Sequence, residues 1–481
     1  MAHVMASESG VVHIKETSFL SGILQAVFSN GFSTISQIFL ILIVPRFIMP
    51  ASYSYWQLYI FYISYVGILH FGWIDGMYLQ LGGKRLENIK GDKISNELCW
   101  FIIFQIIVSI LFVLGTLLGN FDLPNTYVLI QTGIIIFVSN VRSFYFFLFQ
   151  ATNHIHEYSV GTLIEKGITV IMTIMFIVIG LGNLYFLIIA DVLGKIISLG
   201  YTVLVDRNTI LSGIKIKALP LASIKINIIR GGKLLVANFA SLFMIGVVRY
   251  TIKKSFGIVD FGQISIALSI SNFMVMLIQA ISMVLFPYIR RIEFDLVKKL
   301  HSVMRYELSI LFLWLVGIYY IFFPILHIWL PKYSLGLSLL WIIFPVIFFD
   351  GKFELLSSVY FQALNLEGTL YKINLFSLLL SMIWSGANYL FSLPLSMYAL
   401  TIIGTFFSRS FLGEIILLKH FHEKYNKDDL LFYIMIIIFM LSNWLIGFSS
   451  GYIYILLLFL YTAVNSKKIF HCVLEIVKAL K

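Results

Sequence analysis

Residues 97–118 read ELCWFIIFQIIVSILFVLGTLL, an apolar block whose single charged residue stands at its first position. A helix of about 20 residues, rising 1.5 Å per residue, crosses the roughly 30 Å hydrocarbon core of a bilayer. Similar blocks recur along the whole chain, and short polar breaks separate them. Hydrophobic residues make up 60% of the 481 residues and charged residues 12%, about half the charged share of a soluble domain. Because the apolar runs are continuous rather than alternating, they exclude an outer-membrane barrel.

The blocks therefore predict an all-α polytopic membrane protein with about 14 transmembrane helices. The first block, 19–44, is long enough to span, so we expect no cleaved signal peptide. The expected spans are 19–44, 53–79, 97–118, 127–150, 159–180, 184–204, 233–250, 263–288, 306–326, 335–360, 371–390, 395–418, 429–447 and 450–470.

The basic residues predict the orientation of these spans. Placing the N-terminus inside puts 25 of the 34 Lys and Arg residues at cytoplasmic segments and 5 outside, a strong positive-inside bias. Both termini are then expected in the cytoplasm of a bacterial cell, and the chain in its cytoplasmic (inner) membrane. The formal charge of +11 follows this topology, so we expect contacts with anionic membrane lipids and none with nucleic acid.

A short motif recurs in the two halves of the chain. Phe149-Gln150-Ala151-Thr152-Asn153 ends the fourth expected span, and Phe361-Gln362-Ala363-Leu364-Asn365 ends the tenth, 212 residues later. Two further charged pairs match at similar offsets, Arg142 with Glu354 and Lys195 with Arg409. A repeat of six spans keeps its orientation, because six is even. The sequence thus predicts two six-helix lobes related by a pseudo-twofold axis along the membrane normal, plus two C-terminal helices.

The expected domain boundaries follow from this repeat. They are a cytoplasmic N-terminus 1–18, an N-lobe 19–204, a cytoplasmic linker 205–232, a C-lobe 233–418, the last two spans within 429–470, and a cytoplasmic tail 471–481.

Charged residues inside the spans are the main candidates for function. A charge at the bilayer centre costs about 2.5–3.5 kcal/mol, so each should face a partner or a water-filled cavity. Asp191 and Lys195 stand i,i+4 and suit a local ion pair, whereas Asp350 and Glu354 put two like charges on one face, where Arg142 is a candidate partner. The sequence places four cations and four acids in spans: Arg142, Lys195, Lys352 and Arg409, with Asp191, Asp350, Glu354 and Glu414.

Two interpretations of these charges stay open. They could form a cationic cavity for an anionic headgroup, with the carboxylates serving ion coupling or gating. They could equally form buried pairs that hold the lobes together. Polar side chains in spans one and eight present the same choice between hydrogen bonding to sugar hydroxyls and ordinary helix packing: Asn30, Gln37 and Asn272.

Several function classes lack support in the sequence. No phosphate-binding G-x-x-x-x-G-K-[ST] loop occurs, His154 and His156 make only a weak metal pattern, and no long outer loop could hold a glycan polymerase or transferase site. We therefore expect no enzymatic activity and no metal site.

Three segments resemble a known family. Residues 72–84, GWIDGMYLQLGGK, are similar to the D-G-x-Y-x-x-x-G-G segment of polysaccharide flippases. The F-Q-A-x-N ending of span four, followed by His156-Glu157-Tyr158-Ser159, resembles a second family segment, and Arg249 with Phe261-Gly262 resembles a third. The chain thus resembles the Wzx-type flippases of O-antigen and capsule repeat units, within the multidrug/oligosaccharidyl-lipid/polysaccharide exporter superfamily.

The resemblance implies a function. It implies alternating access around a central cavity, an oligosaccharide substrate linked through pyrophosphate to undecaprenol, and coupling to an ion gradient. We expect no cofactor, with Na⁺ or H⁺ as the coupling ion. Substrate-binding roles then fall on Arg142, Lys195, Arg249 and Arg409, and coupling or gating roles on Asp75, Asp191, Asp350 and Glu354.

The resemblance is not complete. Many O-antigen flippases have twelve spans, and fourteen is closer to the lipid II flippase arrangement. Val248 occupies the place before Arg249 where an acidic residue is expected. We expect a monomer that works with polysaccharide polymerase and chain-length proteins. Two other functions stay open, a cation-coupled drug or metabolite exporter of the same superfamily and, with less support, a membrane glycan polymerase or transferase.

Overall fold

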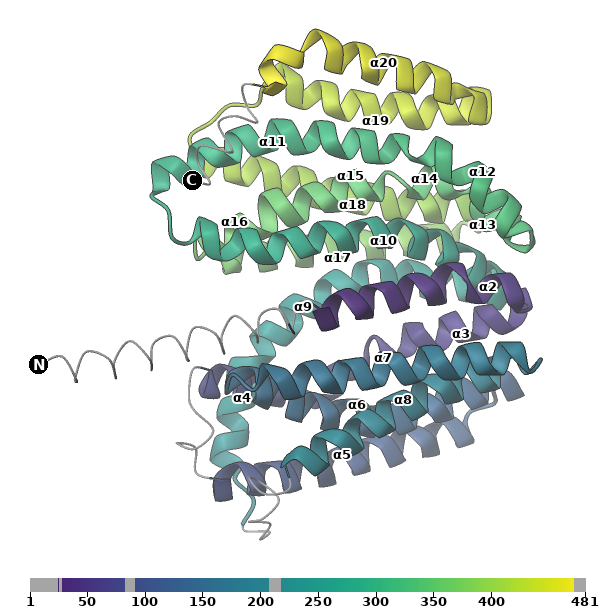
Figure 1. Ribbon diagram of the computed structural model, residues 1–481, viewed down its shortest axis with the longest axis vertical. Helices are drawn as coiled ribbons and strands as arrows, with labels where there is room; N and C mark the ends of the chain where they lie inside the picture. Colours follow the sequence, from purple (N-terminus) through teal and green to yellow (C-terminus); the bar gives the residue numbers. More distant parts are fainter. Residues whose placement is uncertain (1–24, 26–27, 83–90, 207–217, 471–481) are drawn as a thin grey trace, which may run out of the picture. The chain divides into compact units, whose positions relative to one another are not determined.

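The computed structural model describes residue 25 and residues 28–82, 91–206 and 218–470 (Figure 1). Every regular element in these residues is helical, which confirms the all-α class. The expected segments 1–18 and 471–481, and residues 207–217 of the expected linker, lie outside the described residues.

The described helices agree with a polytopic membrane protein. Ten are long and apolar enough to cross a bilayer, or 13 if each bent helix pair makes one span. One of the ten, Lys427–Val464, has 38 residues and is too long for a single crossing. It contains two helices, α19 (Lys427–Ile446) and α20 (Gly451–Val464), which are joined by a turn at Gly447 and lie side by side (Figure 1). Separating them gives the 14 spans expected.

The chain divides into two compact units, Met1–Phe239 and Ala240–Lys481, and the division falls inside a long helix, α9 (Leu221–Phe256). The boundaries expected from the repeat, with lobes 19–204 and 233–418, remain a prediction. The described helices of the first unit are Phe28–Phe47, which includes α2 (Val44–Phe47), then α3 (Pro50–Ile63), η1 (Val66–His70), α4 (Trp73–Leu81), α5 (Gly91–Leu118), α6 (Leu123–Ala151), α7 (Ile155–Val178), α8 (Leu184–Val205) and the start of α9.

The second unit continues from α9. Its helices are α10 (Ile258–Ile289), α11 (Phe294–Gly317), α12 (Tyr319–Trp329), η5 (Pro331–Tyr333), α13 (Ser334–Ser338), α14 (Leu340–Ile343), α15 (Val346–Phe353), the π-helical turn η6 (Glu354–Ser358), α16 (Val359–Ala363), α17 (Glu367–Leu390), α18 (Leu395–His420), α19, η7 (Gly447–Ser450) and α20.

The recurring F-Q-A-x-N motif is a helix C-cap. Asn153 and Asn365 both adopt a left-handed backbone, with φ of 63° and 58°. After each, the next backbone N–H bonds to the Phe carbonyl five residues back, at 2.7 Å in both halves, and the Asn N–H bonds to the Gln carbonyl at 3.3 Å. This pair of bonds is the Schellman motif, in which Asn is an accepted substitute for Gly. The repeat therefore has a physical basis in how two helices end.

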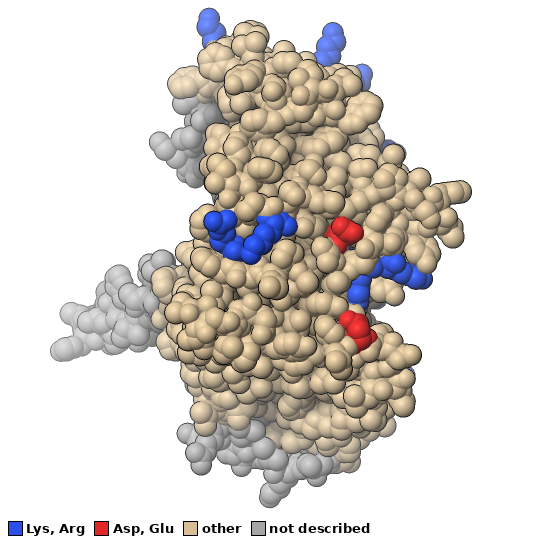
Figure 2. All heavy atoms as spheres, turned by 90° about the vertical axis from the view of Figure 1, so that its right-hand side faces the viewer, with Lys and Arg blue, Asp and Glu red and all other residues tan. Residues whose placement is uncertain are grey.

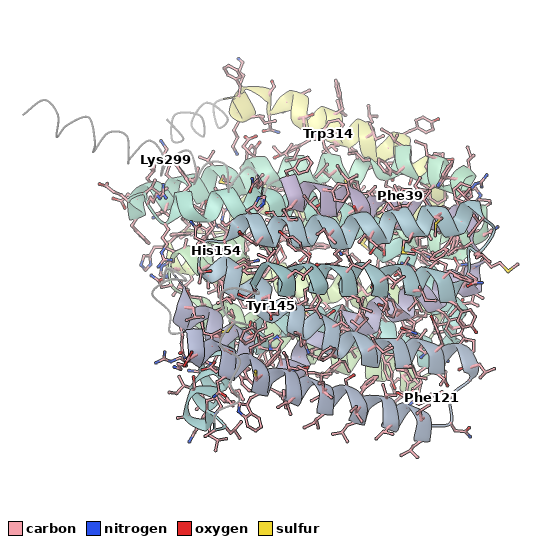
Figure 3. All side chains as sticks on the ribbon, turned by 60° about the horizontal axis from the view of Figure 1, so that its bottom comes forward. Phe39, Phe121, Tyr145, His154, Lys299 and Trp314 are labelled. Carbon is pink, nitrogen blue, oxygen red and sulfur yellow. The ribbon has the colours of Figure 1, made fainter. Side chains whose placement is uncertain are left out.

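The geometry of the repeat extends beyond this cap. Helix α17 begins and ends 212 residues after α7, which is the offset of the two motifs. The turns that follow match as well, because Gly180 and Ser392 are both left-handed. Figure 3 shows Phe121 and His154 at opposite ends of α6, with Tyr145 between them, so this helix runs the full depth of its unit.

The terminal hairpin of α19 and α20 packs on α11 through polar contacts. Arg305 of α11 pairs with Asp429 at 3.3 Å, and Tyr454 of α20 donates to the carbonyl of Leu313 at 2.9 Å. Buried groups of opposite charge and buried hydroxyls must be paired in an apolar surrounding. These contacts fix where the hairpin attaches to the second unit.

The described part of the family-like segment, residues 72–82, lies at a break in the second span. Phe71 and Gly72 are both left-handed, and the span bends by 63° between η1 and α4. Beyond the bend, α4 packs by its apolar face on α5 and α6 in the core of this unit: Trp73, Ile74, Met77, Ile94, Leu98, Phe101, Val141, Phe144, Tyr145, Leu148 and Phe149.

The other face of α4 presses backbone to backbone on the start of α9. A Cβ atom at Gly76 would overlap the carbonyl of Asn227, and one at Gly231 would overlap the carbonyl of Gly72. Small residues allow this approach, as in other membrane helix pairs. The D-G segment therefore places Asp75 beside a glycine-lined helix crossing.

Adding a methyl group at this crossing should destabilise the first unit. We expect Gly76→Ala and Gly231→Ala to cost about 1–3 kcal/mol, because the neighbour they would displace is backbone. Thermal unfolding in detergent, followed by tryptophan fluorescence, measures the effect. Gly115→Ala in α5 is the matched control, since it has open space around it. Equal melting of Gly76→Ala and Gly115→Ala would contradict the crossing.

Candidate functional site

The first unit contains a cluster of charges centred on Glu165. This carboxylate pairs with Arg142 of α6, with Lys166 at 2.9 Å and with Lys195 of α8 at 3.7 Å. Asp191 pairs with Lys195 and accepts a hydrogen bond from Tyr59 of α3 at 2.7 Å. We call these six residues the N-unit cluster: Tyr59, Arg142, Glu165, Lys166, Asp191 and Lys195.

The N-unit cluster lies deep in the helices. Glu165 is ten residues into α7 and Arg142 nine residues before the end of α6, or about 15 Å along each axis. That is roughly half the hydrocarbon thickness. Three cations surround two carboxylates at this depth, so the cluster carries an excess positive charge.

Close helix packing brings the cluster together. Gly194 lets α8 approach α7, because a Cβ atom there would lie 2.7 Å from the carbonyl oxygen of Glu165 and 2.5 Å from Thr169 Oγ1. One helix turn further, Ser198 donates to the carbonyl of Gly161 at 2.7 Å. The neighbouring Lys195 is therefore held within reach of both carboxylates.

The second unit has a cluster around Arg409 whose charge balance is the opposite of that in the N-unit cluster. Its guanidinium donates to Asp350 at 2.9 Å, to Glu354 at 3.4 Å and to the amide oxygen of Asn374 at 3.0 Å. The same guanidinium lies 3.9 Å above the ring of Phe353. We call Asp350, Glu354, Asn374 and Arg409 the C-unit cluster, which has two carboxylates for one cation.

The helix geometry at Glu354 is unusual. Glu354 opens a π-helical turn, Glu354–Ser358, within a span otherwise α-helical. Such turns interrupt an α-helix at a cost and are frequent at functional sites. The expectation that Asp350 and Glu354 share a partner is confirmed, but Arg142 as that partner is wrong. The partner is Arg409, because α18 packs on α15 and η6, whereas Arg142 pairs with Glu165.

The remaining two expected intramembrane charges pair with each other. Lys352 lies 2.8 Å from Glu414, which also accepts hydrogen bonds from Tyr433 at 2.6 Å and Tyr425 at 2.9 Å. The ammonium group lies 4.7 Å from the centre of the Tyr433 ring. This ion pair is almost fully enclosed by protein groups, which favours a structural role.

Arg249 and Asp75 have contacts of their own. Arg249 donates to Ser265 at 2.8 Å and stacks over Phe261 at 4.9 Å. Asp75 lies in the first turn of α4, 3.6 Å from His70, where the positive end of the helix dipole favours a carboxylate. Their assigned roles stay predictions.

The polar residues proposed to bind sugar in spans one and eight differ in their exposure. Asn30 is exposed, whereas Gln37 and Asn272 are half-buried. The carbonyl of Asn30 accepts a hydrogen bond from the Thr34 hydroxyl at 2.9 Å, an ordinary intrahelical contact. The proposed sugar-binding role of these residues remains a prediction.

The sequence reasoning missed two charges in the N-unit cluster. Glu165 and Lys166 lie inside the expected span 159–180, but neither was among the eight intramembrane charges expected. Their position seven residues into that span was the available signal. Asn374 and Tyr59 were missed too, and only the fold shows that they face Arg409 and Asp191.

Comparisons with known proteins show the fold. No protein-family model matches the sequence, and comparison with curated proteins finds no match. Among solved structures, the lipid II flippase MurJ in an inward closed conformation has a TM-score of 0.63 at 15% identity, covering 95% of this chain and 100% of that chain.

Two multidrug transporters are similar as well. An inward-facing MATE family transporter of the MOP superfamily has a TM-score of 0.58 at 14% identity, covering 82% of this chain and 94% of that one. MATE in complex with MaL6 has a TM-score of 0.52 at 12% identity, covering 83% and 96%. The chain thus has the fold of these three structures.

Neutralising the Glu165 carboxylate should lower the stability of the first unit more than neutralising the neighbouring Lys166. Glu165→Gln leaves three cations with Asp191 alone, and breaking a buried pair costs about 3–5 kcal/mol. Lys166→Gln removes the excess cation and should cost less than about 1 kcal/mol. Thermal unfolding of the purified variants compares them. A Lys166→Gln loss as large as that of Glu165→Gln would contradict the arrangement.

Proposed function

We propose that this protein is a flippase that moves undecaprenyl-pyrophosphate-linked oligosaccharide units across the bacterial cytoplasmic membrane for surface polysaccharide biosynthesis. It would work by alternating access, in which a headgroup site opens to one side of the membrane and then to the other. The fold supports a transporter of this kind, and no covalent bond needs to change. The pyrophosphate of the substrate is inferred from the charges of the first unit, and its oligosaccharide from the resemblance of the sequence.

One observation supports an anionic substrate most directly. In the N-unit cluster the most accessible charged side chain is a cation, because Lys166 is 24% exposed whereas the other four are at most 11% exposed. An accessible charge at this depth must face water or a ligand rather than lipid. An excess cation with an arginine behind it suits a pyrophosphate.

The C-unit cluster supports coupling to a cation. Here the most accessible charged member is a carboxylate, Glu354, at 21% exposure, beside Asp350 and the single cation Arg409. Two carboxylates and one arginine leave an excess negative charge that H⁺ or Na⁺ would neutralise. The π-helical turn at Glu354 is a place where the span can change its winding when that charge is neutralised.

The orientation belongs to the same proposal. With both termini in the cytoplasm, the outer face is that of the loops between α5 and α6 and between α7 and α8. Figure 2 shows a mostly uncharged face that carries several groups of Lys and Arg side chains and fewer of Asp and Glu. We further infer a monomer that hands its substrate to polysaccharide polymerase and chain-length proteins.

A second candidate is a cation-coupled drug or metabolite exporter. The likeness to MATE transporters and the acidic balance of the C-unit cluster favour it. The N-unit cluster opposes it, since an accessible excess cation would repel a cationic drug. Neither consideration favours a glycan polymerase or transferase.

Deleting the gene in its own host should abolish surface polysaccharide and accumulate lipid-linked oligosaccharide in the inner leaflet, and the intact gene should restore both. Lys166→Gln should lower the restored polysaccharide about tenfold, the effect of losing one charge-assisted contact, while protein in the membrane stays unchanged. Quantitative blotting of polysaccharide and protein measures both quantities.

The matched control is Lys372→Gln, an exposed cation on α17, the repeat counterpart of α7. It should restore polysaccharide fully. Full restoration by Lys166→Gln at equal protein level would contradict an anionic substrate at the N-unit cluster. A deletion strain with normal polysaccharide but new drug sensitivity would favour the exporter.

A further inference from the structure

A cavity of about 840 Å³ opens in the first unit, and its described lining includes no residue of the N-unit cluster. It lies where α4 ends and where α5 and α9 begin. Its lining combines two cations and two neutral polar side chains with aliphatic ones: Lys93, Arg230, Gln80, Ser223, Leu79 and Ile226. Neither cation forms an ion pair within the described residues, so both charges are available to a ligand.

The floor of this cavity is held in place by buried hydrogen bonds. Glu97, which is 5% exposed, accepts hydrogen bonds from Ser223 and from Asn227 at 3.2 Å. Asn227 in turn accepts one from Gln80 at 2.6 Å. Neutral donors below the cavity thus hydrogen-bond the Glu97 carboxylate. This carboxylate therefore does not pair with the two cations at the mouth of the cavity.

The backbone at the cavity also suits an anion. The lining includes the first three residues of α9, and the N–H groups in the first turn of a helix lack intrahelical acceptors. The positive end of the dipole of this 36-residue helix adds to the two side-chain charges. The glycine crossing of α4 and α9 fixes the direction of that helix end.

The surroundings point to a lipid. The first turns of α9 carry exposed aliphatic side chains, Leu221 at 66%, Ile226 at 45% and Ile229 at 58%. Exposed aliphatic residues beside lysine and arginine are typical of a protein surface at the headgroup level of a membrane, where basic residues contact anionic lipids.

We propose that this cavity binds the phosphate headgroup of a lipid in the cytoplasmic leaflet. The inference rests on the proposed function for its orientation, since that orientation places this helix end at the cytoplasmic surface. The phosphate group contacts Lys93, Arg230 and the first turn of α9. The lipid chain lies along the aliphatic face of α9. Two sources share this chemistry, a resident anionic phospholipid and the polyprenyl pyrophosphate of the substrate.

Native mass spectrometry of the purified full chain tests the site. The protein is titrated in neutral detergent with phosphatidylglycerol, phosphatidylcholine, undecaprenyl pyrophosphate or inorganic phosphate. We expect at least one anionic lipid to bind about thirtyfold more weakly to the double variant Lys93→Gln and Arg230→Gln than to the wild type, from the loss of two surface cations.

The control is the double variant Arg290→Gln and Lys299→Gln, which removes two exposed cations from the second unit. It should bind as the wild type does, and thermal unfolding checks that both double variants are folded. Binding of phosphatidylglycerol alone identifies a resident phospholipid site, and binding of undecaprenyl pyrophosphate alone identifies a substrate site.

Other outcomes would overturn the proposal. These are equal lipid binding by the Lys93/Arg230 variant and the wild type, binding of inorganic phosphate without lipid, or an equal preference for phosphatidylcholine. The titration needs no transport activity. Loss of binding in the variant, together with failed restoration of polysaccharide by the wild type, would therefore refute the flippase function and keep the lipid site.

Discussion

The cost of placing charges in the bilayer governs the interior of this protein. An unpaired charge at mid-depth costs several kcal/mol, and each unit meets that cost by gathering charges from separate helices. Glu165 joins α6, α7 and α8 in the first unit, and Arg409 joins α15, η6, α17 and α18 in the second. Because these contacts link helices across each unit, the charges help to determine which helices are neighbours.

The same constraint explains how the two units differ. Helix α17 repeats α7 at an offset of 212 residues, and α6 and α16 end in the same Schellman cap, so these parts of the two units share a backbone plan. Their charge balance is reversed, with an excess cation in the N-unit cluster and an excess carboxylate in the C-unit cluster. A repeated backbone can therefore offer one site for an anion and one for a cation, as an ion-coupled transporter of an anionic lipid needs.

Part of this structure could be predicted from the sequence. Span positions follow from apolar block length, and the Asp191–Lys195 pair follows from i,i+4 spacing on one helix. Contacts between helices could not be predicted, because they depend on which helices pack together. Arg142 was assigned to Glu354 by repeat position, yet it pairs with Glu165, since α6 packs on α7 within the first unit. The crossing of Gly76 with Asn227 joins residues far apart in the chain and leaves no local signal.

The central claim is that each unit pairs its intramembrane charges among its own helices, and a double-mutant cycle on Arg409 and Asp350 tests it most directly. Arg409→Gln, Asp350→Asn and the double variant are unfolded in parallel, with Arg409→Gln and Glu414→Gln as the control pair on one helix. The account gives a coupling free energy of about 1–3 kcal/mol for Arg409 with Asp350, and near zero for the control, because Glu414 pairs with Lys352. No coupling between Arg409 and Asp350, or equal coupling in both cycles, would contradict it.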